Sequence, residues 1–257
     1  MKLEIACHRF ENRVAIVTGG ANGIGRATAL RLAVEGAHVV IADIEIEPAN
    51  EVADLIRESG RKALAMEVDV SLSQDADQLA AATLDGFGRI DILCNIAGGP
   101  APSQTPFHES DEEVWDRVMA VNLKSQRNCA RAVINHMIEK QGGKILNMAS
   151  SSAMLGMVNM VDYATSKGGV ISFTRALAKE VAQYNINVNA ISPGTVMTRG
   201  LEMFPERWDE FNQMSGMGRV GTTDEIAALV AFLVSDEAGY VTGQNYPVCG
   251  LLNLGLG

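Results

Sequence analysis

The stretch Val14-Ala15-Ile16-Val17-Thr18-Gly19-Gly20-Ala21-Asn22-Gly23-Ile24-Gly25 decides the fold of this chain. An apolar, β-branched run ends in a glycine-rich turn, and an apolar helical pattern then continues to Val34. Glycines let the backbone turn tightly and approach a ligand closely. The helix that follows offers free N–H groups and a positive dipole end, which suit a phosphate group. The stretch therefore predicts a strand, a phosphate-binding turn and a helix.

The next apolar run, residues 38–42, ends at Asp43, which lies 18 residues after Gly25. A carboxylate at this position of a βαβ unit accepts hydrogen bonds from adenosine ribose hydroxyls and repels a 2′-phosphate. Asn22 and Ile44 add no positive charge beside it, and Arg26 should point along the first helix. The sequence thus predicts a dinucleotide site that prefers NAD to NADP.

Strand-like and helix-like runs alternate along the rest of the chain, which predicts a doubly wound α/β domain. We expect one domain over residues 1–257, with about seven parallel strands and helices on both faces of the sheet. The expected strands span residues 13–18, 38–42, 62–67, 90–95, 144–149, 187–191 and 245–248. The expected helices span residues 23–35, 48–59, 73–86, 111–140, 162–184 and 222–235.

Polar residues and glycines gather where these strands are expected to end. In such a sheet, ligands bind beyond the carboxyl ends of the strands. The residues expected to converge on this edge are Gly19, Asp43, Asp69, Asn95, Ser150 and Pro193.

Tyr163 and Lys167 stand four residues apart in a helical pattern, so they share one face of the helix. An ammonium beside a phenol favours the phenolate and lowers the pKa of the tyrosine. A phenol tuned in this way can exchange a proton with an alcohol oxygen, which the hydroxyl of Ser150 can also hydrogen-bond. No Gly-x-Ser-x-Gly surrounds the serines, which argues against a serine hydrolase.

Taken in order, these motifs resemble the short-chain dehydrogenase/reductase family in its compact single-domain form. The resemblance covers nearly the whole chain. The matching positions are Thr18, Gly19, Gly23, Gly25, Asp69-Val70, Asn95-Ile96-Ala97-Gly98, Asn122, Ser150, Tyr163, Lys167, Pro193-Gly194, Thr198 and Val241-Thr242-Gly243.

The resemblance implies a catalytic set of four residues. Tyr163 is the implied acid/base, and Lys167 lowers its pKa and binds the nicotinamide ribose. Ser150 holds the substrate oxygen, and Asn122 keeps a water that links Lys167 to solvent.

The resemblance also implies the residues that contact NAD. Asp69 and Val70 should contact the adenine, and Pro193, Gly194, Val196 and Thr198 should hold the carboxamide end. The full set expected at the cofactor is Gly19, Asn22, Gly23, Ile24, Gly25, Asp43, Ile44, Asp69, Val70, Asn95, Ala97, Gly98, Tyr163, Lys167, Pro193, Gly194, Val196 and Thr198.

Two positions depart from the family pattern. Ile96 replaces a second asparagine, and Val248-Cys249-Gly250-Leu251 replaces Val-Asp-Gly-Gly. An apolar tail then runs to Gly257, which suggests packing at a subunit interface. The family usually forms homotetramers, so we expect one here.

Residues 199–218 interrupt the alternation with several apolar side chains. They indicate either a substrate lid or an amphipathic helix packed on the body, and their place at the active edge favours the lid. The expected pocket wall contains Gly99, Pro100, Ser152, Met154, Gly156, Met157, Met160, Met197 and Met203. Adaptable methionines favour a partly apolar secondary alcohol or its ketone as substrate. Arg199 is either a surface arginine or a contact for an anionic substrate.

Composition excludes several other classes of protein. The formal net charge is −10 and no basic residues cluster, which argues against nucleic acid and anionic membranes. Four cysteines and four histidines lack metal-ligand spacing, so no metal site is expected. No signal peptide or membrane-spanning run is apparent, and free thiols are typical of the cytoplasm.

Two other functions remain open. An epimerase or dehydratase could use the same tyrosine and lysine, although such relatives are longer and space their glycines differently. A non-catalytic dinucleotide-binding protein is the other, but it usually lacks the tyrosine or the lysine, and here both are present.

Overall fold

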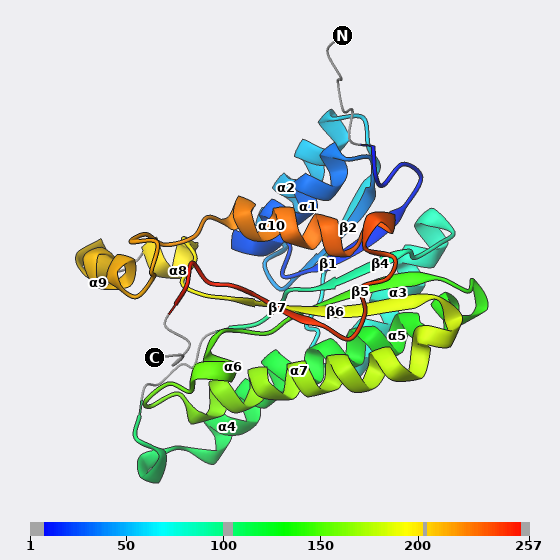
Figure 1. Ribbon diagram of the computed structural model, residues 1–257. Coiled ribbons are helices and arrows are strands. Elements are labelled where there is room, and N and C mark those ends of the chain that lie inside the picture. Colours follow the sequence, from blue (N-terminus) through cyan, green and yellow to red (C-terminus); the bar gives the residue numbers. More distant parts are fainter. Residues whose placement is uncertain (1–7, 100–104, 203–204, 253–257) are drawn as a thin grey trace.

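Seven parallel strands form the centre of the molecule in a computed structural model that describes residues 8–99, 105–202 and 205–252 (Figure 1). Their order is β3-β2-β1-β4-β5-β6-β7, so the chain reverses direction across the sheet between β1 and β4. The strands are β1 Val14–Thr18, β2 His38–Asp43, β3 Ala63–Glu67, β4 Ile92–Asn95, β5 Gly143–Met148, β6 Ile186–Pro193 and β7 Asn245–Val248. The predicted doubly wound sheet is confirmed, with each strand end within two residues of its expected position.

Helices cover both faces of this sheet (Figure 1). On one face lie α1 Gly23–Val34, α2 Ile46–Glu58 and α10 Thr223–Leu233. On the other lie α3 Ser73–Phe87, α4 Glu112–Met119, α5 Ser125–Glu139 and α7 Val161–Val181. The shorter helices are α6 Ser152–Leu155, α8 Arg199–Glu202 and α9 Trp208–Gln213. Within the described ranges, every helix is too short or too polar to cross a bilayer.

The central strand β1 is almost entirely apolar because its two faces enter two different cores. In β1, Val17 packs in the core with α1, α2 and α10, whereas Ile16 packs with α3 and α5. Both side chains are fully buried. Burying a side chain of this size stabilises the fold by about 1.5–3 kcal/mol. Double burial explains why these strands lack the alternation of a half-exposed sheet.

The single helix predicted over residues 111–140 is wrong, because a π-helical turn, Ala120–Lys124, separates α4 from α5. Side chains bind the main-chain carbonyls at this turn. Ser125 donates to the Val121 carbonyl at 2.6 Å, and Gln126 donates to the Asn122 carbonyl at 3.0 Å. Such turns widen a helix locally and often mark functional sites. This one turns Asn122 toward the carboxyl edge of the sheet.

The glycine-rich turn closes tightly on the start of α1. A Cβ atom on Gly25 would lie 1.9 Å from the Gly19 carbonyl oxygen, which is main chain and cannot move aside cheaply. A Cβ on Gly19 would lie 2.8 Å from the Cα of Ala97, and the φ of Gly19 is +64°. Glycine is therefore required by space at both positions, and at Gly19 by the backbone angle as well.

We predict that Gly25→Ala lowers the free energy of unfolding by about 1–3 kcal/mol, because overpacking forces a backbone shift. The matched control is Gly86→Ala in α3, where an added Cβ meets no atom within 4 Å. That change should raise stability by about 0.4–1 kcal/mol, since it reduces the freedom of the unfolded chain. Urea unfolding midpoints measure the change in stability for both Gly25→Ala and Gly86→Ala. Equal effects of the two substitutions would contradict the close approach at Gly25.

Candidate active site

A cavity of about 510 Å³ opens at the carboxyl edge of the sheet, beside the reversal between β1 and β4. Most of the residues expected at the cofactor line it. They are Gly19, Asn22, Gly23, Ile24, Gly25, Asp43, Ile44, Asp69, Val70, Ala97, Gly98 and Thr198. Sequence analysis missed Ala42, Glu45, Val68, Ser71, Ile96, Val121, Met148, Arg199 and Gly200.

Thr18 and Asp43 fix main-chain segments around this cavity through hydrogen bonds. The Thr18 hydroxyl accepts hydrogen bonds from the main-chain N–H groups of Ile96 and Ala97, both at 3.1 Å. Asp43 accepts from the main-chain N–H groups of Ala21 at 3.0 Å and Glu45 at 3.1 Å. Asp43 therefore fixes the glycine-rich turn. Each carboxylate oxygen keeps further acceptor capacity for a ligand hydroxyl.

Gly23 and Gly98 leave room at the two ends of the cavity. A Cβ on Gly23 would lie 3.4 Å from Thr198 Cγ2, so the turn and the residue after β6 face each other closely. A Cβ on Gly98 would lie 2.7 Å from Asn122 Oδ1 and 3.2 Å from Lys167 Nζ. The structure thus brings together Gly98, Asn122 and Lys167, as the sequence predicted. The glycine-rich turn at the start of α1 and the acceptor Asp43 are features that suit a dinucleotide.

Lys167 is 3 % exposed, and its amino group donates to the Met148 carbonyl at 3.0 Å. Burial lowers the pKa of this lysine to about 8. Nζ lies 5.8 Å from the centre of the Tyr163 ring. The helical spacing of the two residues on α7 therefore places the amine beside the phenol, as predicted.

The pKa of Tyr163 is raised rather than lowered. Burial of the phenol is the dominant cause, and its hydrogen bond with Ser150 acts in the opposite direction. The expectation that Lys167 lowers this pKa is therefore not met, because desolvation outweighs the other effects here. Ser150 is itself held by Ser152, which donates to its Oγ from the side chain at 2.8 Å and from the main chain at 3.2 Å.

Asn122 fixes the segment after β4. Its side chain donates to the Gly99 carbonyl and accepts from the Gly99 N–H group, both at 3.1 Å. Gln126, which sequence analysis missed, is equally fixed: it donates to the carbonyls of Asn122 and Met148, both at 3.0 Å. Because Met148 also binds Lys167, Gln126 connects the π-helical turn to this buried lysine. The sequence signal that could have indicated this contact is a glutamine four residues after Asn122.

Six residues expected at the cofactor do not line the cavity: Asn95, Tyr163, Lys167, Pro193, Gly194 and Val196. For three of them the structure gives a reason. Asn95 points into the protein, where it donates to Asn147 Oδ1 at 2.9 Å, and its own Oδ1 is buried without a hydrogen-bond partner in the described structure. Val196 is buried in the core on the α10 side of the sheet. Gly194 packs on the main chain of Cys249, with 2.8 Å from its ideal Cβ position to Cys249 Cα.

The region expected to form the lid begins with α8 and continues through α9. Arg199 lies on the cofactor side, where its guanidinium approaches Glu45 at 3.4 Å and leaves both side chains largely exposed. Asn22 also donates to Glu45, at 2.9 Å. These contacts link the start of α8 to the loop after β2 and place Arg199 beside the nucleotide groove.

Of the expected substrate wall, the structure describes all but two residues, since Pro100 and Met203 lie outside the described ranges. Ser152 and Met154 belong to the short helix α6, directly after Ser150. Met154 and Met157 remain partly exposed, at 41 % and 37 %. This end of the site therefore offers adaptable apolar surface close to Tyr163.

Comparison with known proteins places this geometry in a family. A family model described as Enoyl-(Acyl carrier protein) reductase matches residues 19–251. The (2S)-[(R)-hydroxy(phenyl)methyl]succinyl-CoA dehydrogenase subunit BbsD of Thauera aromatica is 40% identical, over 94% of this chain and 96% of its own. The NAD-dependent glycerol dehydrogenase of Listeria innocua is 38% identical, over 93% of each chain. The crystal structure of an NAD+-bound xylitol dehydrogenase superposes with a TM-score of 0.89 at 32% identity, over 94% of this chain and 99% of its own.

The burial of Lys167 generates a stability prediction. Its pKa falls from 10.5 to about 8 on folding, so below pH 8 the charged amine destabilises the folded state by a cost on the order of 3 kcal/mol. Between pH 8 and 10.5 the unfolded chain holds a proton that the folded chain has released, so wild-type stability rises with pH. We expect Lys167→Met to be more stable than wild type at pH 7 by roughly 1–3 kcal/mol, with this difference fading by pH 10.5.

Urea unfolding at several pH values, without cofactor, measures this difference. Lys179→Met, at an exposed position of the same helix, is the matched control and should show no such pH-dependent gain. Parallel stability curves for wild type and Lys167→Met would contradict the lowered pKa.

Proposed function

The chain belongs to the short-chain dehydrogenase/reductase family, and on that premise we propose that this oxidoreductase interconverts a secondary alcohol and its ketone with NAD as cofactor. The observation that carries the proposal is the meeting of Ser150, Tyr163 and Lys167, with Lys167 beside Gly98 and Met148 of the nucleotide cavity wall. NAD, when bound, accepts or supplies the hydride. The protein must then hold the substrate oxygen and move one proton.

Ser150 and Tyr163 are the groups that can hold the substrate oxygen. Both carry hydroxyls, and the hydrogen bond between them brings the two hydroxyls close together, which supports a shared contact with one substrate oxygen. During alcohol oxidation, Tyr163 takes the hydroxyl proton; during ketone reduction, it returns one. Ser152 restrains Ser150, which keeps one of the two contacts in a fixed position. The geometry therefore supports general acid/base catalysis by Tyr163.

Lys167 has two roles in this proposal. Its buried amine stabilises a phenolate that forms on Tyr163 during turnover, because the two groups share a site of low dielectric constant. It also faces Gly98, on the wall where the nicotinamide ribose would bind. Asn122 and Gln126 hold the main chain around this lysine. These contacts support an enzyme rather than a binding protein.

Asp43 supports NAD as the cofactor. Its carboxylate lines the cavity at the end of β2, and Glu45 brings a second negative charge to the same loop. A 2′-phosphate placed there would meet two carboxylates, whereas ribose hydroxyls would meet hydrogen-bond acceptors. The names of the Listeria and xylitol relatives, which specify NAD, agree with this proposal.

The substrate end supports a partly apolar alcohol. Met154, Met157 and Met160 follow Ser150 closely in the chain and supply the apolar surface, whereas glycerol and xylitol, in the names of two relatives, are fully hydroxylated alcohols. We extend the proposal to a cytoplasmic homotetramer, which the acidic composition and the exposed apolar side chains of Tyr240 and Leu251 support.

We predict that Tyr163→Phe lowers kcat by at least about 100-fold, because it removes the proton-transfer group. NADH binding, followed by fluorescence, should persist. Tyr240→Phe is the matched control, since that side chain is fully exposed, and its kcat should not change. A panel of secondary alcohols, polyols and hydroxy acids with NAD, read at 340 nm, supplies the substrate. Turnover that survives in Tyr163→Phe would overturn the assigned acid/base.

We predict that kcat/KM with NAD exceeds that with NADP by at least about 100-fold, because like charges brought together cost several kcal/mol. Asp43→Asn should narrow this ratio by about tenfold while keeping an acceptor for the main-chain N–H groups. Asp54→Asn, on the exposed side of α2, should leave the ratio unchanged. A wild-type preference for NADP would refute the proposed role of Asp43.

A further inference from the structure

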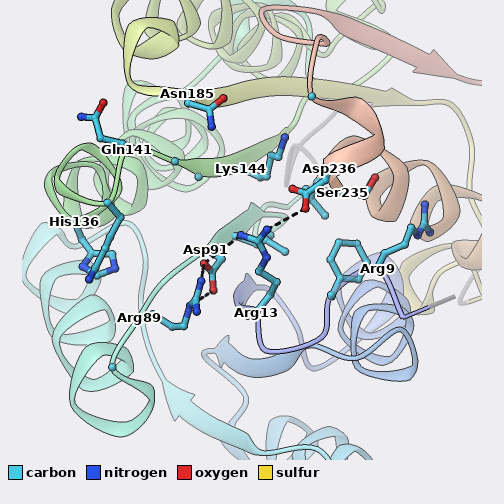
Figure 2. A pocket seen from close by; sticks show the side chains of 18 residues that line it. Arg9, Arg13, Arg89, Asp91, His136, Gln141, Lys144, Asn185, Ser235 and Asp236 are labelled. Atoms are coloured by element: carbon cyan, nitrogen blue, oxygen red, sulfur yellow. Dashed lines mark hydrogen bonds and ion pairs between the residues drawn. The ribbon is translucent and has the colours of Figure 1, made fainter.

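A second cavity, of about 600 Å³, lies at the opposite edge of the sheet, where β1, β4, β5 and β6 begin (Figure 2). The proposed function makes no use of it. Arg13 precedes β1, Arg89 and Asp91 precede β4, Lys144 lies at the start of β5, and Asp236 follows α10. Figure 2 shows these five side chains around one space, with Arg13 near its middle.

This cavity is basic within an acidic protein. Arg13, Arg89, Lys140 and Lys144 line it, opposed by the carboxylates of Asp91 and Asp236. Its wall therefore carries an excess of two positive charges on a chain whose net charge is −10. Arg9 also reaches the wall, but Glu35 and Glu237 bind its guanidinium. Such a local reversal of charge is the electrostatic signature of an anion site.

The two carboxylates are already bound. Asp91 accepts from Arg89 at 2.6 and 2.8 Å and from the main-chain N–H of Val14 at 2.8 Å. Arg13 lies 3.6 Å from Asp91 and donates to Asp236 at 3.0 Å. These contacts fix the arginines in place, as the dashed lines of Figure 2 show. With these contacts made, neither the Asp91 nor the Asp236 carboxylate lies close to the amino group of Lys144.

Lys144 is a partly buried cation of this cavity that, among the described residues, no carboxylate pairs directly. It is half-buried, and its amino group donates to the neutral Asn187 Oδ1 at 2.7 Å. Among the residues that the structure describes, no carboxylate oxygen lies within 4.0 Å of this nitrogen. Burial lowers the pKa of Lys144, Arg13 lowers it further, and Asp236 raises it. An anion in the cavity would supply the missing counter-charge.

We propose that this cavity binds the phosphoryl group of a small metabolite between Lys144 and Arg13. A phosphate dianion matches the excess of two positive charges, and arginine with lysine is a common pairing for phosphate. The volume exceeds what one phosphate needs and lies within the range of small-molecule sites. Asn185, Gln141 and Ser235 surround the remaining space with amide and hydroxyl groups, which suit a hydroxylated body (Figure 2).

Isothermal titration calorimetry on the full chain, saturated with NADH, tests the proposal. NADH blocks the other groove that favours phosphate. Inorganic phosphate and glucose 6-phosphate are titrated separately at constant ionic strength. We expect one site per chain. Tighter binding of glucose 6-phosphate identifies a phosphorylated metabolite as the ligand, whereas equal binding identifies free phosphate at the same site.

Lys144→Gln should raise the dissociation constants for inorganic phosphate and glucose 6-phosphate by at least about tenfold. A loss of this size is expected when one charge-assisted hydrogen bond is removed. Glutamine can still hydrogen-bond Asn187. The matched control is Lys62→Gln, because Lys62 is an exposed lysine directly before β3, four strands from β5. The dissociation constants of this variant should stay within about twofold of the wild-type values. If Lys144→Gln does not fold, Arg13→Gln gives the same test, because Arg13 is partly exposed.

Three results would overturn the proposal: no heat of binding in the wild type, equal binding by wild type and both cavity variants, or binding that NADH abolishes. The last would place the phosphate in the nucleotide groove. None of these outcomes depends on turnover, so the proposal stands or falls separately from the proposed oxidoreductase activity.

Discussion

A parallel sheet that is buried on both faces restricts polar chemistry to the two edges where its strands begin and end. Every strand delivers its last residues to one edge and its first residues to the other. In this protein both edges are hollow, and each holds a half-buried or buried lysine. Strand β5 reaches both: it begins beside the basic cavity with Lys144 and ends with Met148, which binds Lys167. The strands that are buried on both faces stabilise the fold and thus also determine where ligands can bind.

The lysine at the carboxyl edge shows how function can oppose stability. Burial disfavours the charge of Lys167, and only a main-chain carbonyl binds its amine among the described residues. The surrounding structure holds the amine in place through Gln126 and the π-helical turn. A cofactor that approaches this wall meets donors that are already oriented, so little reorganisation remains for the reaction itself.

Motifs whose chemistry is local were predictable from the sequence. The glycines of the turn, Asp43 and the Tyr163–Lys167 pair stand at regular spacings in the sequence, which locates them, although Asp43 and Gly19 contact the distant residues Ala21 and Ala97. Strand ends were equally clear, because double burial produces uninterrupted apolar runs. These features were enough to predict the fold and most of the cofactor cavity.

What sequence could not predict depends on contacts between distant segments. The π-helical turn is stabilised by the side chains of Ser125 and Gln126, which a helical pattern would accept without a break. Asn95 turns inward because Asn147 lies on the adjacent strand. Desolvation, which dominates the pKa of Tyr163, exists only once the site has folded. The basic cavity assembles residues from four strands and a helix end, so no run of sequence contains it.

The packing of Gly194 against Cys249 constrains how this lineage can change. The main chain of residue 249 occupies the space that any side chain at position 194 would need. A substitution of Gly194 at the end of β6 therefore requires the main chain after β7 to move at the same time, which a single mutation does not achieve. The unusual cysteine is tolerated because its backbone makes the contact. Any residue at position 249 presents these main-chain atoms, so position 194 is restricted to glycine.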